Sequence, residues 1–188
     1  MTTVAVVYHS GYGHTEVQAK AVARGVEKVA GTTLHLLTSE DAQQQWDLLK
    51  SVDAIIFGSP TYMGSASAQF KTFMDASSKA WYTRDWQNKV AAGFTTSASQ
   101  SGDKLNTLIQ LAIFAAQHGM IWVGQDLLPG NNHSKGSVND LNRLGGFLGA
   151  MAQANSDQGP DVAPLQSDLL TAEHLGERVA TIAKQLHG

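Results

Sequence analysis

The strongest constraint on the fold is a repeated alternation of short apolar runs with segments of helical periodicity. The expected strands are Val4–Tyr8, Thr33–Leu37, Ala54–Gly58, Val90–Thr95 and Met120–Val123. The expected helices are Thr15–Ala30, Asp41–Lys50, Ser67–Lys79, Asp103–His118 and Thr171–Leu186. Such alternation predicts an α/β fold with a parallel sheet covered by helices on both faces. Right-handed crossovers then favour a doubly wound arrangement of three layers, α/β/α.

One stretch, residues 124–166, breaks this alternation. It is rich in Gly, Asn, Ser, Asp and Pro and is too long for an ordinary connection. Loops of this length in compact domains are usually functional or disordered, and we expect a functional loop here. The 188 residues suit one domain, and no linker divides them, so residues 1–188 are expected to form a single unit.

Composition excludes several classes of protein. The chain has no cysteine, which rules out disulfide frameworks, thiolate catalysis, iron–sulfur clusters and Cys-ligated zinc. Its formal net charge of −3 argues against a nucleic-acid partner. The histidines are scattered without ligand spacing, so no metal site is expected. Neither a signal peptide nor a membrane-spanning run is visible, and we expect a cytoplasmic protein without a membrane partner.

The first chemistry-bearing loop follows the first expected strand and opens a helix. Its residues are Ser10, Gly11, Tyr12, Gly13, His14 and Thr15. Glycines allow close backbone approach, while hydroxyls and free N–H groups at a helix N-terminus bind phosphate. The loop lacks the Gly-Lys-Ser/Thr of a Walker A motif, and Glu16 occupies the third glycine position of a dinucleotide fingerprint. An ordinary capped turn between strand and helix is the alternative.

Two further loops follow the third and fourth expected strands, at the same edge of the sheet. The second loop is Ser59–Ser65, in which Tyr62 and Met63 offer flat or soft apolar surface beside a planar ring. The third is Thr95–Gly102, whose hydroxyls and backbone could bind a polar ring edge. A rigid turn and a solvated Ser/Thr loop are the respective alternatives. The cofactor-binding residues predicted here are Pro60, Thr61, Tyr62, Met63, Gly64, Thr96, Ser97, Ala98, Ser99, Gln100 and Ser101.

At these loops the sequence resembles the tryptophan-repressor-binding-protein (WrbA) family of flavodoxin-like NAD(P)H:quinone oxidoreductases. Ser10–His14 matches the family's Ser-x-Tyr-Gly-His phosphate loop, and Gly58–Gly64 matches its Gly-x-Pro-Thr-x-x-Gly loop. Gln69–Asp75 matches the helix that follows, and His118-Gly119-Met120 matches the segment before the fifth strand. The resemblance covers nearly the whole chain. It departs at Tyr62, where the family commonly has Arg, and at Gln117, where it commonly has His.

The resemblance implies a five-stranded sheet in the flavodoxin order 2-1-3-4-5, with one FMN held by the three loops. It further implies NADH or NADPH as electron donor, a quinone as substrate, and a homo-oligomer, a dimer or tetramer, whose pockets are completed by neighbouring subunits. The expected catalytic residues are His118, Gln117 and Trp81. His118 is the preferred proton donor, with Tyr62 or water as alternatives and a helix-capping role as the competing interpretation. The exposed cluster for subunit packing is expected at Trp81, Tyr82 and Trp86.

Two functions remain open on the sequence. The first is two-electron transfer from NAD(P)H to a quinone in ping-pong order. The second is a flavodoxin-type electron carrier or a flavin-binding regulatory module. Electron-carrying flavodoxins tend to be strongly acidic around the flavin, which steers them to basic partners. The balance of 13 basic against 16 acidic residues favours the enzyme.

Overall fold

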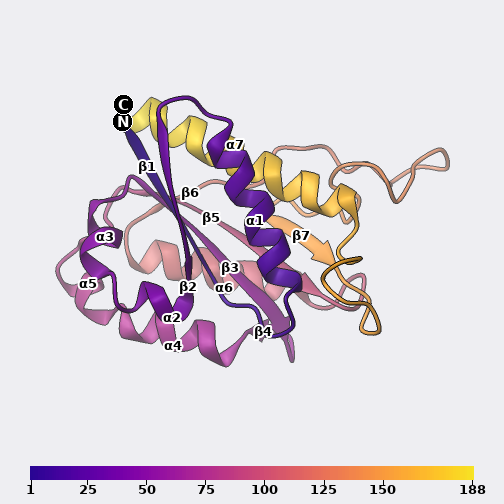
Figure 1. The fold of residues 1–188 in the computed structure, drawn as a ribbon, viewed down its shortest axis with the longest axis horizontal. Coiled ribbons are helices and arrows are strands. Elements are labelled where there is room, and N and C mark those ends of the chain that lie inside the picture. The colour runs from indigo at the N-terminus through magenta and orange to yellow at the C-terminus, as the bar shows by residue number, and fades with distance from the viewer.

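The computed structural model describes all residues, 1–188, and is a three-layer α/β/α domain (Figure 1). The strands are β1 (Thr2–Tyr8), β2 (Thr32–Thr38), β3 (Ala54–Tyr62), β4 (Ser65–Ala66), β5 (Val90–Ser97), β6 (Ile121–Trp122) and β7 (Ala150–Gln153). The helices are α1 (His14–Glu27), α2 (Ser39–Ala42), α3 (Trp46–Ser51), α4 (Ala68–Ala76), α5 (Ser78–Tyr82), α6 (Lys104–Gln117) and α7 (Gln166–His187).

The central sheet runs β2-β1-β3-β5-β6, and these neighbours are all parallel. This confirms the predicted flavodoxin order 2-1-3-4-5. Along β1, Val4, Val6 and Tyr8 face one core, while Ala5 and Val7 face the other. Both faces of the central strands are therefore buried, which explains their nearly continuous apolar sequences.

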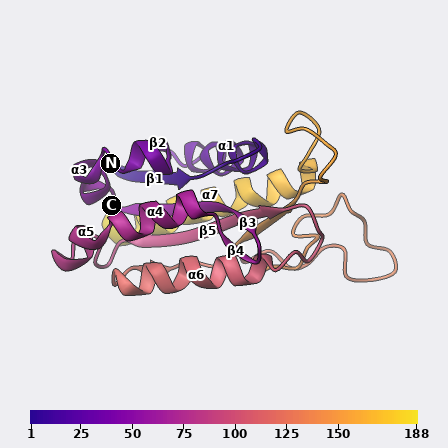
Figure 2. The same cartoon turned by 90° about the horizontal axis from the view of Figure 1, so that it is seen from below.

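The two faces of the sheet are covered by different sets of helices (Figures 1 and 2). One apolar core contains residues of α1 and α7, and the other contains residues of α4 and α6. The backbones of α1 and α7 approach each other closely where they cross, because each helix has a glycine at the crossing. A Cβ on Gly25 would come within 1.8 Å of the Glu173 carbonyl oxygen, and one on Gly176 within 2.0 Å of the Val22 carbonyl oxygen.

The fifth position of the sheet differs from the prediction. The expected strand Met120–Val123 is reduced to β6, which pairs only with the start of β5, at Val90 and Ala91. The carboxyl half of β5, Phe94–Ser97, pairs instead with β7. The chain between β6 and β7 extends away from the sheet (Figures 1 and 2). The stretch 124–166 is therefore not one loop, because it returns to complete the fifth strand.

The second predicted loop also has more regular structure than expected. Strand β3 continues through Tyr62 and pairs with β4 in an antiparallel hairpin, in the register Thr61 to Ala66 and Tyr62 to Ser65. Met63 and Gly64 form the turn, with φ of 48° and 80°. Two-residue turns with positive φ suit the twist of a hairpin. Gly64 accepts this conformation readily, whereas Met63 is an uncommon residue for it.

Candidate functional site

A cavity of about 630 Å³ opens at the carboxyl edge of the sheet. Parallel α/β sheets bind ligands at this edge. Ten of the residues predicted from sequence line the cavity, together with four from the segment after β7. The lining residues are Ser10, Tyr12, His14, Thr15, Pro60, Thr61, Tyr62, Thr96, Ser97, Ala98, Ala154, Ser156, Gln158 and Gly159. None of them is Asp, Glu, Lys or Arg, so the cavity is polar without a fixed full charge.

One end of the cavity is formed by the N-terminus of α1. The Ser10 hydroxyl accepts hydrogen bonds from the N–H groups of Gly13 and Glu16, each at 3.1 Å. Gly13 is the N-cap, with a φ of 90°, and provides no side chain to cap the helix. The N–H groups of His14 and Thr15 therefore face the cavity end without a partner from the cap. This set of neutral donors at a helix N-terminus suits a phosphate group.

The segment after β7 covers this loop. His14 Nε2 lies 2.8 Å from the carbonyl oxygen of Gln158. A Cβ on Gly13 would come within 2.8 Å of Pro160 Cγ, so only glycine fits between the helix start and this proline. The sequence predicted a functional loop in this region but none of the individual residues from Ala154 to Gly159. The proximity depends on β7, which the periodicity did not reveal.

The hairpin and the end of β5 form further walls of the cavity. Tyr12 and Tyr62 meet edge to face, with ring centroids 6.2 Å apart. Burial raises the pKa of Tyr62, and Tyr12 raises it further. The Tyr62 phenol is therefore a protonated hydrogen-bond donor at neutral pH. The Met63 side chain at the hairpin turn is fully exposed and lies at the rim rather than in the wall.

A layer of buried hydroxyls supports the cavity floor. The Thr61 hydroxyl lies 2.8 Å from the hydroxyls of both Thr95 and Thr107. The Thr96 hydroxyl donates to Gln18 Oε1 at 2.6 Å, and the Gln18 amide donates to the Ala150 carbonyl. These bonds fix the ends of β3 and β5 relative to α1 and β7. The floor is thus held by neutral hydrogen bonds between elements distant in the sequence.

The other predicted cofactor residues lie around the cavity and not in its wall. Gly11 and Gly13 belong to the first loop itself, and Gly64 to the hairpin turn. Gln100 and Ser101 line a neighbouring open groove of about 950 Å³, between the start of α6 and residues 143–148. Ser99 is exposed beside them.

The residues present fit an FMN cofactor. The cavity combines hydroxyl and N–H donors at the start of α1, which suit a phosphate, with aromatic and hydroxyl groups of the hairpin and of β5, which suit a ring system. Ligand sites of this kind occupy roughly 300–1,000 Å³, and the cavity lies within that range.

Comparison with known proteins gives the same assignment. Residues 12–134 match the family model described as NADPH-dependent FMN reductase. The chain is 31% identical to an NAD(P)H dehydrogenase (quinone) of Geobacter sulfurreducens, over 98% of this chain and 99% of that protein. The chain belongs to the WrbA-type family of flavodoxin-like NAD(P)H:quinone oxidoreductases.

Two other relatives refine this picture. A WrbA-like flavodoxin structure from Agrobacterium tumefaciens is 43% identical, with a TM-score of 0.73, and the match covers 98% of this chain and 99% of that one. Flavodoxin FldP of Pseudomonas aeruginosa is 46% identical over the full length of both chains. Two proteins similar to this chain are thus named flavodoxins, and one of them is also named WrbA-like.

The expected proton donor of this WrbA-type chain, His118, is far from the cavity. It follows α6 at the amino edge of the sheet, where Gly119 bonds to Asn88 before β5. Strand β5 separates the two edges and has 8 residues, which span about 25 Å at roughly 3.3 Å per residue. His118 is only 2% exposed and lies against Trp86, with ring centroids 4.2 Å apart.

The state of His118 also disagrees with a role in proton transfer. Its Nε2 lies 2.9 Å from the Ser77 hydroxyl. Burial, together with a smaller effect of the nearby Arg84, lowers the pKa of His118 from 6.5 to about 4. The residue does cap α6, but burial outweighs the preference of a helix C-terminus for a cation. Within one chain His118 is therefore a neutral, packed side chain that does not reach the cavity, and its role as proton donor from a neighbouring subunit stays a prediction.

The aromatic cluster predicted after the third helix separates into two groups. Trp86 is fully buried and stacks with Trp46 and Phe73, so its assignment to an exposed patch was wrong. Trp81 is 45% exposed, and Tyr82 and Gln117 are exposed as well. All three lie at the amino edge. Within one chain they cannot reach the cavity at the carboxyl edge.

No group of three or more His, Asp or Glu side chains comes together in a way that could hold a metal ion. No helix is both long and apolar enough to cross a bilayer.

Proposed function

We propose that this protein binds FMN in the cavity at the carboxyl edge and transfers two electrons from NADH or NADPH to a quinone. Family membership confirms the sequence prediction of FMN as cofactor and of NAD(P)H as electron donor. The observation that carries the proposal is the cavity itself, whose lining combines donors for a phosphate at the start of α1 with aromatic groups. The assignments of individual residues below are part of the proposal.

The start of α1 holds the phosphate. Ser10 and Thr15 provide hydroxyls, and His14 and Thr15 provide N–H groups aligned with the helix axis. The Gln158–Pro160 segment closes over this end and excludes water, because His14 bonds to Gln158 and Pro160 packs on Gly13. Hydrogen bonds to a charged phosphate are stronger in such a partly covered position.

The hairpin and the end of β5 orient the ring system. Pro60, Thr61 and Tyr62 line one side of the cavity, and Thr96, Ser97 and Ala98 line another. When bound, FMN supplies the hydride-accepting and electron-transferring chemistry. Tyr62 and Tyr12 would form an aromatic wall against which a nicotinamide or a quinone stacks.

The same cavity would serve both substrates in turn. A nicotinamide and a quinone would each have to contact the bound cofactor through this one cavity, so they would not bind together, which predicts a ping-pong scheme. The side chains that line the cavity include no carboxylate, and Tyr62 stays protonated because burial raises its pKa. Tyr62 therefore orients a substrate oxygen by donating a hydrogen bond. The proposal takes water as the source of the proton for the reduced quinone, because His118 is buried against Trp86.

Subunit assembly completes the pocket in this proposal. The outer face of α6 carries an apolar stripe at one-turn spacing, Leu105, Ile109 and Ile113, each side chain exposed in the single chain. Together with Trp81 and Tyr82, this stripe supports a homo-oligomer, a dimer or tetramer. Trp81 and Gln117 can reach a carboxyl-edge cavity only from another subunit.

Four measurements test the proposal. The purified protein should bind FMN and show its visible spectrum, and riboflavin should bind much more weakly. It should consume NADH or NADPH in the presence of benzoquinone. Double-reciprocal plots at varied donor and quinone should give parallel lines, whereas intersecting lines would show a ternary complex and overturn the shared pocket. Light scattering that gives the monomer mass of 20.0 kDa at micromolar concentration would contradict the oligomer.

A second candidate is an electron carrier that exchanges electrons with protein partners. The 46% identity with flavodoxin FldP favours it. A carrier would bind FMN but consume NAD(P)H only when a separate flavodoxin reductase is added. Direct consumption of NAD(P)H by the purified protein alone, at steady state with benzoquinone, would exclude the carrier as its sole function.

A further inference from the structure

A buried lysine lies directly behind the wall of the cavity. Lys104 is the first residue of α6, and its side chain is only 1% exposed. Its Nζ donates hydrogen bonds to the Ser97 hydroxyl at 2.7 Å and to the Ser99 carbonyl oxygen at 2.8 Å. Ser97 lines the cavity, so the ammonium is one hydrogen bond away from the cavity wall.

Residues 97–102, the loop that surrounds this ammonium, are tightly packed. A Cβ on Gly102 would come within 2.2 Å of the Ser97 hydroxyl oxygen. Ser97 also donates a hydrogen bond to the Ser99 carbonyl at 3.0 Å. Residues 97–102 include no titratable side chain, so the direct partners of Lys104 are neutral.

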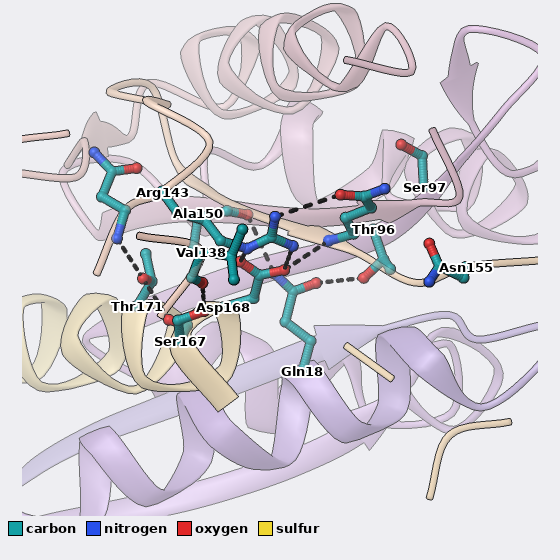
Figure 3. A network of polar contacts seen from close by, with 12 residues as sticks. Gln18, Thr96, Ser97, Val138, Arg143, Ala150, Asn155, Ser167, Asp168 and Thr171 are labelled. Carbon is teal, nitrogen blue, oxygen red and sulfur yellow. Dashed lines mark hydrogen bonds and ion pairs between the residues drawn. The ribbon is translucent and has the colours of Figure 1, made fainter. Parts of the chain in front are cut away.

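Asp168, the carboxylate whose charge raises the pKa of Lys104, is committed to another cation. Arg143 binds Asp168 through two hydrogen bonds, Nε to Oδ1 at 2.8 Å and Nη2 to Oδ2 at 2.7 Å, and Figure 3 shows the two side chains facing each other. Asp168 Oδ2 also accepts the Gln153 N–H at 2.9 Å. The group formed by Lys104, Arg143 and Asp168 therefore carries a net positive charge in a buried position. Buried charges without a dedicated partner are costly, and they mark positions where a ligand can compensate.

We propose that Lys104 is a positioning residue that favours reduced over oxidised FMN, by placing a positive charge behind the Ser97–Ser99 wall. The inference rests on the proposed function, because it requires FMN in this cavity. Two-electron reduction with uptake of one proton leaves the bound cofactor with one additional negative charge. Lys104 stabilises that charge across the wall, and no acidic side chain of the cavity opposes it.

The protonation of Lys104 follows from its surroundings. Burial lowers the pKa of Lys104 from 10.5 to about 8, with Asp168 on α7 raising it and Arg143 lowering it. Asp168 and Arg143 are the charged groups that shift its pKa, since loop 97–102 and Gln153 on β7 are neutral and the preceding Asp103 is exposed to solvent. At neutral pH Lys104 is charged. Above pH 8 it is increasingly neutral in the oxidised protein, and reduction draws a proton back to it, so two protons accompany the two electrons.

The experiment measures the two-electron midpoint potential of the FMN-bound protein against a reference dye, from pH 6 to 10. The variants are Lys104→Met, which removes charge and hydrogen bonding, and Lys104→Gln, which removes only the charge. Lys89→Met is the matched control, because Lys89 also bonds to backbone carbonyls, of Lys50 and Val52, and burial also lowers its pKa, but it lies at the amino edge of the sheet.

We expect both Lys104 variants at pH 7 to bind reduced FMN about tenfold more weakly relative to oxidised FMN. That ratio corresponds to a potential lower by about 30 mV for a two-electron couple. Lys89→Met should leave the potential unchanged. The wild-type potential should fall more steeply with pH above 8 than that of either variant, so that the difference between them shrinks. This difference in pH dependence can be measured even if only one of the two Lys104 variants folds.

Equal potentials for wild type and Lys104→Gln across this pH range would overturn the inference. A shift of the potential in Lys89→Met as large as that in the Lys104 variants would overturn it as well. A lower potential in Lys104→Met alone would assign the effect to hydrogen bonding and would also overturn it. If the wild type binds FMN and oxidises NAD(P)H but these shifts are absent, only the role of Lys104 fails. If the wild type binds no FMN, the proposed function fails with it.

Discussion

The two edges of the sheet differ in how closely their side chains are packed. At the carboxyl edge, hydroxyls, backbone N–H groups and two tyrosines surround a cavity of about 630 Å³. At the amino edge, Trp46, Phe73, Trp86, Phe114 and His118 pack ring against ring. Each edge also has a histidine and a lysine bonded to backbone or hydroxyl groups. These are His14 and Lys104 at the carboxyl edge, and His118 and Lys89 at the amino edge. The amino edge has only a smaller pocket, of about 350 Å³, beside these rings.

This difference follows from strand direction. In a parallel sheet every strand ends at the same edge, and the connections to helices there leave helix N-termini free. At the other edge the helices end and return to strands, so apolar side chains fill the space. A buried titratable residue is therefore informative only together with the edge at which it lies. His118 and Lys104 both have pKa values lowered by burial, yet only Lys104 adjoins the cavity.

The largest effect expected from a single change at the amino edge is the loss of Trp86. Trp86→Ala leaves a large cavity among rings that cannot close over it, and we expect the free energy of unfolding to fall by about 3–5 kcal/mol. The FMN dissociation constant of the folded protein should stay within about twofold. Chemical denaturation of the apoprotein and fluorescence titration with FMN measure the two quantities. A comparable change in both would show that the two edges are energetically coupled.

The next effect concerns acid stability. The pKa of His118 is about 4 in the folded protein, below its value of 6.5 when unfolded, so the unfolded state binds more protons between these values. The contribution of neutral His118 to stability is fully present above pH 6.5 and is lost as the pH falls through about 4. This corresponds to roughly 3 kcal/mol at most.

His118→Gln tests this assignment, because an amide can keep the bond to Ser77. Denaturation at pH 7 and pH 4 should show a smaller loss for the variant than for the wild type. Turnover with benzoquinone should change by less than about twofold. A large fall in kcat, with FMN still bound, would restore His118 as a participant in the reaction.

At the carboxyl edge, a double substitution should weaken the cofactor. Ser10→Ala with Thr15→Ala removes hydroxyls at the phosphate end, and we expect weaker FMN binding by about 1–3 kcal/mol. Riboflavin lacks the phosphate, so its dissociation constant should hardly change. Titration with both ligands makes the comparison. Equal weakening of both would place the effect on the fold and not on phosphate recognition.

The smallest expected effect is that of Trp81. An aromatic stacking contact contributes about 0.5–1.5 kcal/mol, so Trp81→Ala should slow quinone turnover by about two- to tenfold and leave FMN bound. The side chain is half-exposed in the single chain, so stability should change little. Steady-state kinetics measures the first and thermal unfolding the second. If turnover is unchanged in an oligomeric protein, Trp81 is not part of a neighbour's pocket.

The sequence predicted the alternating strands and helices because buried parallel strands and amphipathic helices have distinct periodicities, and the family resemblance implied the strand order. It also indicated which loops meet, since parallel strands bring their carboxyl ends together. It did not predict the hairpin at Met63, because methionine at positive φ carries no turn signal. Nor did it predict β7, whose four residues are too few for a periodic pattern.

Burial was the other property that local patterns could not provide. Lys104 occupies the first position of a helix, where a lysine is normally solvated, and only the wrapped loop 97–102 buries it. Trp86 was grouped with Trp81 by proximity in the sequence, although a short turn sends the two side chains into different environments. The cover formed by Gln158 and Pro160 depends on tertiary contacts across most of the chain.

The split fifth strand has a consequence for how the chain could be cut. β6 and β7 occupy separate halves of β5, so the sheet does not require the connection between them to be continuous. Residues 131–135 at its tip are exposed. A nick at this tip would leave an amino-terminal piece carrying most of the sheet and a carboxyl-terminal piece carrying β7 and α7. The glycine crossing of α1 and α7 would hold the pieces together, so the domain is suited to fragment complementation and to insertion of a guest segment.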